Sequence, residues 1–163
     1  MPRVTVQTFT LLAAAGARNL TWYHLFDSPN RDNADSEDWF GLVWRKSADE
    51  WIEKGGFRGY TLCAKNLPGK TYKQLQFPGN ALPKSIQNHY FEGHDSEDGS
   101  RALLVWNTDP LSEVNLRITL NGNNHKLWDI ASGESEDIAK TSTHTLYPTN
   151  TAQKTLIFLT WQE

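Results

Sequence analysis

Three aromatic residues, Trp22, Tyr23 and Trp39, have the chemistry needed to bind a sugar. Trp22 and Tyr23 lie in the apolar run Leu20–Phe26, and Trp39 opens a second apolar run after a polar loop. An aromatic face can stack on the apolar face of a pyranose ring, so we treat the three as candidate carbohydrate contacts. For Trp22 and Tyr23, core packing in a buried strand explains the same pattern, and we favour that interpretation over sugar binding.

Asp27 is the acidic residue best placed for chemistry, because it follows the apolar run where a strand would end. Barrel enzymes keep active groups at such strand ends. A turn residue before Ser28 and Pro29 explains the position equally simply, and this is the better interpretation. We therefore assign no catalytic residue from the sequence.

Metal and cofactor sites are not indicated. The acidic loop around Asp32–Asp38 could offer oxygen ligands to calcium, but it lacks the EF-hand spacing and its glycine, so we expect a solvated loop. The five histidines include no pair spaced i, i+4, and Cys63 is the only cysteine, which argues against zinc. Gly55 and Gly56 lack the rest of a phosphate-binding loop. We expect neither a metal nor a cofactor.

Composition narrows the possible partners. The 163 residues carry a net charge of −3, and their sixteen basic residues form no stripe, which argues against nucleic acid. The apolar run Leu11–Ala15 is too short for a signal peptide or a membrane span, so we expect no membrane partner and assign no compartment. Seven Trp residues exceed what a core alone needs, which leaves room for a binding surface.

The N-terminal half predicts a helix, a strand, a loop and a second helix. The first helix falls within Val4–Arg18 and closes at Gly16. Asn19–Phe26 reads as a buried strand, and Phe57–Leu67 carries apolar residues along one helical face. This order is typical of an α/β barrel, and nothing later in the chain repeats it.

The C-terminal half predicts an antiparallel β-sandwich. Val114–Leu120 alternates apolar and polar residues, so Val114, Leu116, Ile118 and Leu120 should face the core. Turn signals such as Asn121-Gly122 separate the runs. The expected strands are Ile86–Glu92, Ala102–Trp106, Val114–Leu120, Lys126–Ile130, Thr143–Tyr147 and Thr155–Trp161. The predicted fold is mainly β with an N-terminal α/β segment: residues 1–78 form a barrel-end-like segment and residues 79–163 form the sandwich.

Several motifs resemble the C-terminal part of retaining glycoside hydrolases of the large (β/α)8 barrel clan. Thr21-Trp22-Tyr23 is similar to their last barrel strand, and Trp39–Leu42 to a Trp-Phe-Gly-Leu phrase in the loop that follows. Phe57–Leu67 resembles the closing helix of the barrel. Tyr90–Glu92 and Ser100–Asn107 resemble the first strands of the small β-sandwich that follows the barrel.

The resemblance implies a carbohydrate-associated accessory region without catalytic residues of its own. In that clan the two catalytic carboxylates, about 5 Å apart in retaining enzymes, lie on earlier barrel strands that this chain does not contain. The expected partners are a polysaccharide or oligosaccharide, the missing barrel domain, or a second copy of the chain. Two alternatives stay open: a purely structural domain that binds no glycan, and part of a split glycosidase that a partner chain completes.

Overall fold

The computed structural model describes residues 2–17, 19–21, 25–27, 41–47, 49–73, 82–93, 99–150 and 154–163. Within these ranges the chain forms two helices and ten strands. The N-terminal elements are α1 (Pro2–Ala14), β1 (Val43–Arg45), β2 (Trp51–Glu53), α2 (Gly55–Asn66) and β3 (Lys70–Lys73). The remaining strands are β4 (Ile86–Gly93), β5 (Ser100–Asn107), β6 (Val114–Thr119), β7 (Asn123–Trp128), β8 (Ser135–Asp137), β9 (Thr141–Leu146) and β10 (Leu156–Gln162).

A six-stranded antiparallel sheet in the order β3-β4-β5-β10-β7-β8 forms the centre of the molecule. Its middle strand β5 is buried throughout Ala102–Trp106, with no residue there more than 4% exposed. An unbroken apolar run of this kind is typical of a strand covered on both faces, whereas a strand with one wet face alternates. The central sheet must therefore be the inner layer of the fold.

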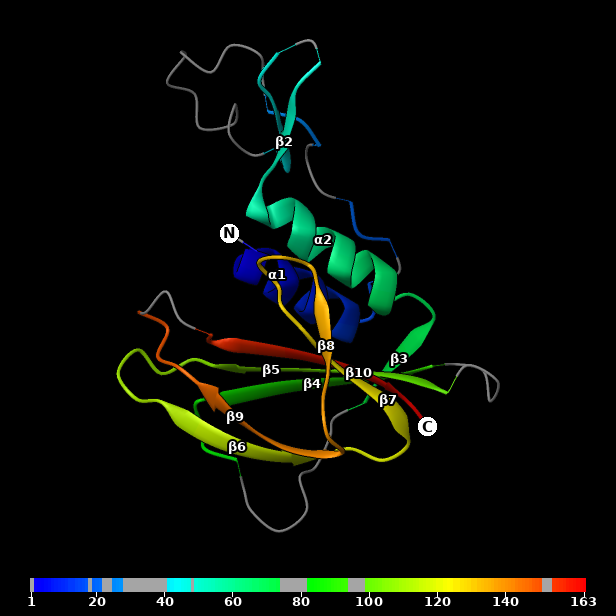
Figure 1. Cartoon of the computed structure of the whole chain (residues 1–163), viewed down its shortest axis with the longest axis vertical. Coiled ribbons are helices and arrows are strands. Elements are labelled where there is room, and N and C mark those ends of the chain that lie inside the picture. Colours follow the sequence, from blue (N-terminus) through cyan, green and yellow to red (C-terminus); the bar gives the residue numbers. More distant parts are fainter. Residues whose placement is uncertain are drawn as a thin grey trace.

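Strands β6 and β9 cover one face of the central sheet (Figure 1). Leu116, Ile118 and Leu120 are buried against the sheet, Val114 is half-buried beside them, and Arg117 is exposed. The predicted register of this strand is therefore confirmed. The prediction of a mainly β fold with antiparallel sheets and helices in the N-terminal part is also confirmed.

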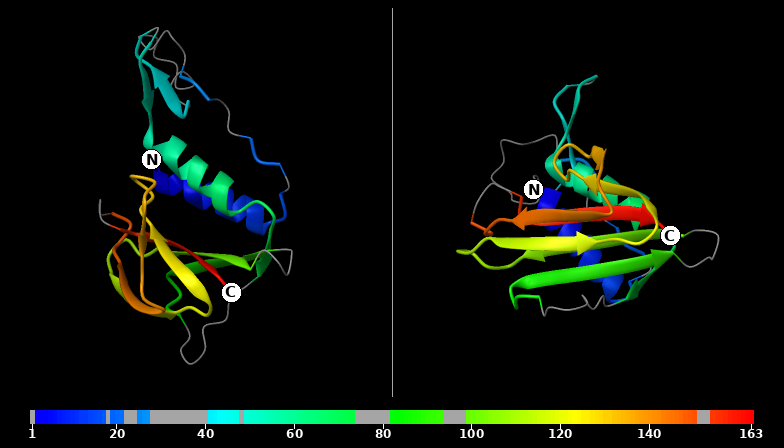
Figure 2. Two further views of the ribbon diagram at one scale, coloured as in Figure 1. Left: turned by 45° about the vertical axis from the view of Figure 1, so that its right-hand side comes forward. Right: turned by 60° about the horizontal axis from the view of Figure 1, so that its bottom comes forward.

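Helices α1 and α2 cover the opposite face of the sheet (Figures 1 and 2). Phe9 of α1 and Leu62 of α2 join Leu104 and Phe158 of the sheet in one hydrophobic cluster. The layers are thus helices, six-stranded sheet and two-stranded sheet. The predicted domain boundary, between residues 78 and 79, lies outside the described residues.

The two helices pack closely because glycines line the contact. A Cβ atom on Gly59 would lie 2.6 Å from the carbonyl oxygen of Pro2, and one on Gly55 would lie 2.7 Å from the ring of the same proline. Helix α1 then ends as predicted: Gly16 adopts φ +86°, and the N–H of Ala17 donates to the carbonyl of Leu12 at 3.0 Å. This left-handed glycine cap closes the last turn of the helix.

The predicted buried strand Asn19–Phe26 is wrong for the residues that the structure describes. Residues 19–21 form no strand, and Phe26 makes only a single parallel bridge, to Val43. Leu25 and Phe26 are 45% and 44% exposed. An apolar run becomes a buried strand only where other elements cover both faces. The ring of Phe26 lies beside that of Trp51, with centroids 4.9 Å apart, and stays partly exposed.

Candidate functional site

The predicted carbohydrate contacts Trp22, Tyr23 and Trp39 lie outside the described residues. Their role in binding a glycan therefore stays a prediction. Leu20 and Thr21, which precede Trp22 in the chain, line a large hollow of about 1050 Å³.

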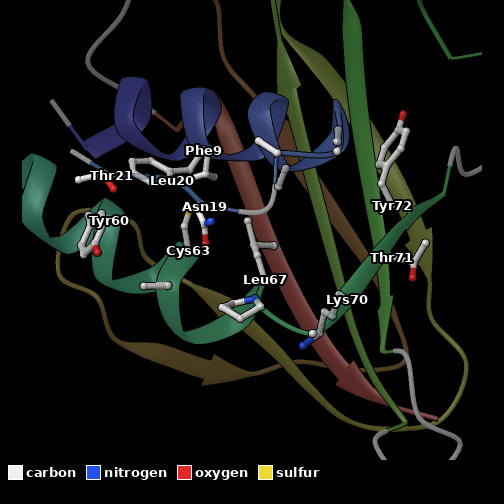
Figure 3. A pocket seen from close by; sticks show the side chains of 17 residues that line it. Phe9, Asn19, Leu20, Thr21, Tyr60, Cys63, Leu67, Lys70, Thr71 and Tyr72 are labelled. Carbon is white, nitrogen blue, oxygen red and sulfur yellow. The ribbon is translucent and has the colours of Figure 1, made fainter. Parts of the chain in front are cut away.

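The large hollow lies between the C-terminal halves of α1 and α2, the segment 19–21 and the start of β3 (Figure 3). Its wall is mostly apolar and aromatic, with Phe9, Tyr60 and Tyr72 among the lining residues. Among the described residues that line the hollow, Lys70 is the only one with a charged side chain, and none is Asp or Glu. Such a wall can hold an apolar surface of a ligand, and its described residues offer no carboxylate for acid–base chemistry.

Cys63 lines the same hollow but is unsuited to nucleophilic chemistry. Its side chain is 2% exposed and lies 3.9 Å from the carbonyl oxygen of Val6. Burial raises the pKa of the thiol to about 12. Because the thiolate is the reactive form, a buried thiol of this kind is inert.

A smaller hollow of about 250 Å³ lies between the outer face of α2 and the turn that joins β7 to β8. Trp128 forms an aromatic wall, and Arg58, Lys65, Glu53 and Ser132 contribute polar groups. The ammonium of Lys65 lies 5.4 Å from the centroid of the Trp128 ring. Sequence reasoning missed this group, since Trp128 was placed only as a strand residue.

The spacing of the charges on α2 was the available signal for the smaller hollow. Arg58 and Lys65 lie seven positions apart, which places both side chains on one face of a helix. What the sequence did not reveal is that a turn more than sixty positions away faces them. Arg58 Nη1 donates to the carbonyl oxygen of Ala131 in that turn at 2.7 Å.

Asp27 forms a buried ion pair, a role that neither sequence interpretation included. Its side chain is fully buried, and Lys54 Nζ donates to its Oδ1 at 2.6 Å. The same ammonium also donates to the carbonyl oxygen of Gly41 at 2.9 Å. Lys54 precedes the first residue of α2, so the pair joins the segments around residues 27 and 41 to the start of that helix.

Other described carboxylates also form ion pairs with lysine or arginine side chains. Glu92 lies between Lys73 and Arg101, with Arg101 Nη2 3.0 Å from Glu92 Oε1, and Arg101 also contacts Glu163. Within the described ranges, no group of three or more His, Cys, Asp or Glu side chains could hold a metal ion. No helix in that part of the chain is long and apolar enough to cross a membrane.

Three of the described histidines are buried, His89, His125 and His144, and none of them lines either hollow. His89 stacks on Trp106, with ring centroids 4.7 Å apart, and desolvation by burial lowers its pKa. Neither ring nitrogen of His89 has a hydrogen-bond partner among the described residues. His144 Nε2 lies 2.7 Å from Ser142 Oγ, and its pKa is also lowered, chiefly by burial.

No family model and no curated protein matches this chain. Solved structures of glycoside hydrolases are similar to it in part. The GH51 α-L-arabinofuranosidase of Thermotoga petrophila RKU-1 aligns with a TM-score of 0.45 and 10% identity, over 76% of this chain and 32% of that one. A GH44 xyloglucanase of Paenibacillus polymyxa, solved with xyloglucan, aligns with a TM-score of 0.38 and 15% identity, over 74% of this chain and 25% of that one.

A second structure of a Paenibacillus polymyxa GH44 xyloglucanase gives a TM-score of 0.38 and 18% identity, over 73% of this chain and 25% of that one. This chain therefore spans a quarter to a third of the enzymes it resembles. All three TM-scores lie below the level at which a shared fold is established.

Proposed function

We propose that this chain is a non-catalytic, carbohydrate-associated C-terminal region of a glycoside-hydrolase-like protein. The sequence motifs of a closing barrel helix and of the first sandwich strands support this assignment. The secondary structure of these motifs is of the type that the assignment requires. Phe57–Asn66 lies within the helix α2, and Tyr90–Glu92 and Ser100–Asn107 lie in the paired strands β4 and β5.

The distribution of carboxylates carries the non-catalytic part of the proposal. Retaining hydrolysis needs two carboxyl groups about 5 Å apart beside the scissile bond. Among the described residues, no carboxylate lines the larger hollow and Glu53 alone lines the smaller one. Asp27, the first carboxylate after Thr21-Trp22-Tyr23 in the chain, pairs with Lys54. This arrangement supports binding rather than hydrolysis.

For the glycan contacts we keep Trp22, Tyr23 and Trp39. Their rings would stack on pyranose faces, an interaction that depends on aromatic area and tolerates different sugars. Electrophoresis of the purified chain through gels that contain single soluble polysaccharides tests this role. At least one polymer should retard the protein, and replacing the three aromatic residues with alanine should remove the retardation.

Trp51→Ala is the matched control, since Trp51 is a 48% exposed tryptophan outside the proposed set. Its replacement should leave the retardation unchanged. Migration unaffected by every polymer, or equal losses in Trp51→Ala and the triple variant, would count against glycan binding. Hydrolysis of an aryl glycoside that a single carboxylate substitution abolishes would overturn the non-catalytic assignment.

Completion by a partner is a second candidate, favoured by one observation. The bridge between Phe26 and Val43 is parallel, whereas every pairing between the described strands is antiparallel. Parallel strands occur in sheets that are covered on both faces, yet Leu25 and Phe26 are almost half exposed. The cover would come from the missing barrel domain or from a second copy of the chain.

Light scattering after size exclusion separates the two sources of cover. A dimer that Phe26→Ser converts to a monomer supports a second copy. A monomer favours a separate barrel domain as the source of cover. Co-purification of the chain with the product of a neighbouring upstream reading frame tests for such a partner. A stable monomer that retains no such product would argue against completion by a partner.

A further inference from the structure

The turn between β7 and β8 forms a fixed wall beside α2. Within it, Asp129 Oδ1 accepts hydrogen bonds from the N–H groups of Ala131 at 2.7 Å and Ser132 at 3.3 Å. The N–H of Gly133 donates to the carbonyl of Asp129 at 2.8 Å, and Gly133 adopts φ +77°. Arg58 then ties this turn to α2 through Ala131. The smaller hollow is therefore formed before any ligand arrives.

Trp128 gives this hollow a flat aromatic wall in a fixed orientation. Its Nε1–H donates to Thr160 Oγ1 at 2.9 Å, which fixes the indole within the sheet. The ring is half-buried, and the ammonium of Lys65 lies above it at 5.4 Å from the centroid. Because lysine has a flexible four-carbon stem, it can leave the ring face while its charge stays at the rim.

The charges of the described side chains that line the hollow are unbalanced. Arg58 and Lys65 contribute two cations, and Glu53 contributes the one carboxylate among the described lining residues. Glu53 Oε2 lies 4.0 Å from Arg58 Nε, and both side chains are about half exposed, so solvent weakens this pair. A ligand that brings one negative charge would complete the group.

We propose that this hollow binds a single sugar ring that carries a carboxylate, a hexuronate unit of an acidic glycan. The ring stacks on Trp128, and its carboxylate pairs with Arg58 and Lys65. The volume of about 250 Å³ falls below the roughly 300–1,000 Å³ of pockets for drug-sized ligands, so the hollow suits one ring. The choice of a sugar rests on the proposed function above; the charge and the size come from the hollow itself.

Nuclear magnetic resonance titration of the whole chain with D-galacturonate tests the proposal. The indole N–H of Trp128 and the backbone amides around Arg58 and Lys65 should shift and saturate. D-Galactose, which lacks the charge, and acetate, which lacks the ring, should produce much smaller changes at equal concentration. Equal responses to galactose or to acetate would overturn the requirement for both parts of the ligand.

Two variants locate the charge. Lys65→Met keeps most of the stem and removes the cation, and should weaken binding about tenfold, the size of one charge-assisted hydrogen bond. Arg58→Met should weaken it at least as much. Lys140→Met, at an exposed lysine before β9, is the control and should bind as the parent does. Unchanged affinity in Lys65→Met would overturn the proposal even if Arg58→Met disturbs the turn.

The outcome also separates this inference from the proposed function. If a polysaccharide retards the chain in gels while Trp128 does not respond to galacturonate, glycan association stands and this site is wrong. If Trp128 responds to galacturonate but no polysaccharide retards the chain, the site is supported and the proposed function is wrong.

Discussion

Cys63 lies against the contact between α1 and α2, where it contributes packing rather than reactivity. With a pKa of about 12, only about one thiol in ten thousand is ionised at pH 8. We expect the thiol of the native chain to resist Ellman's reagent. In guanidinium, one thiol per chain should react with it. Rapid labelling under native conditions would show that the two helices open.

His89 makes the stability of the chain depend on pH. Burial lowers its pKa, so the unfolded chain takes up a proton first as the pH falls. Stability should therefore be flat above about pH 6.5 and decrease as the pH falls below that value. The urea midpoint measured between about pH 8 and about pH 5 reports this slope.

His89→Phe keeps a ring against Trp106 and should remove part of the slope. The remainder belongs to His144, whose pKa is lowered in the same direction. A urea midpoint that falls equally steeply in His89→Phe would show that His89 contributes nothing to it.

At the scale of elements, the contact between α1 and α2 depends on the absence of a side chain at Gly59. Alanine favours a helix interior by about 1 kcal/mol over glycine, but its Cβ would lie 2.6 Å from the carbonyl oxygen of Pro2. Because the backbone at Pro2 must move to admit this atom, we expect Gly59→Ala to lower the free energy of unfolding by about 1–3 kcal/mol. Thermal and urea unfolding measure the change.

Thr61→Ala is the control for Gly59→Ala, because Thr61 is exposed on the same helix. It should be neutral or slightly stabilising, since alanine is the better helix former. A stabilised Gly59→Ala would mean that the helices separate at little cost.

The ion pair between Lys54 and Asp27 fixes the start of α2 to the segments around residues 27 and 41. Lys54→Met would remove the ammonium from a buried carboxylate. Breaking a fully buried pair typically costs about 3–5 kcal/mol, and the 28% exposure of the Lys54 side chain places this pair at the lower end of that range. We expect a loss of that order at neutral pH by urea unfolding. Adding Asp27→Asn should recover part of it, and a double variant no better than Lys54→Met would contradict this account.

At the scale of the whole molecule, both faces of the central sheet need cover. Helices α1 and α2 bury Leu104 and Phe158 on one face, and β6 and β9 bury Leu103 and Leu159 on the other. We therefore expect the fragment 82–163 to bind a hydrophobic dye and to lose the near-ultraviolet circular dichroism of the full chain. A fragment with a cooperative unfolding transition of its own would instead show that the predicted sandwich folds without the helices.

Local signals predicted much of this fold. The glycine cap of α1 and the alternation along β6 are settled by neighbouring residues, and both were found from the sequence. The ion pair of Asp27 was not, because its partner Lys54 lies far along the chain and carries no motif. The contact of Arg58 with Ala131 is more distant still, so the smaller hollow emerges only once the helices pack on the sheet.

Strand β10 lies between β5 and β7 in the central sheet, although it follows all of the other strands in the chain. During synthesis, β3, β4 and β5 can pair with one another, and so can β7 and β8, but the two groups have no shared neighbour until Leu156–Gln162 has left the ribosome. Until then the edges of β5 and β7 that β10 will cover stay unpaired, and unpaired strand edges are templates for association between chains. Chaperone binding during translation should therefore matter most over the interval between the emergence of β7 and that of β10.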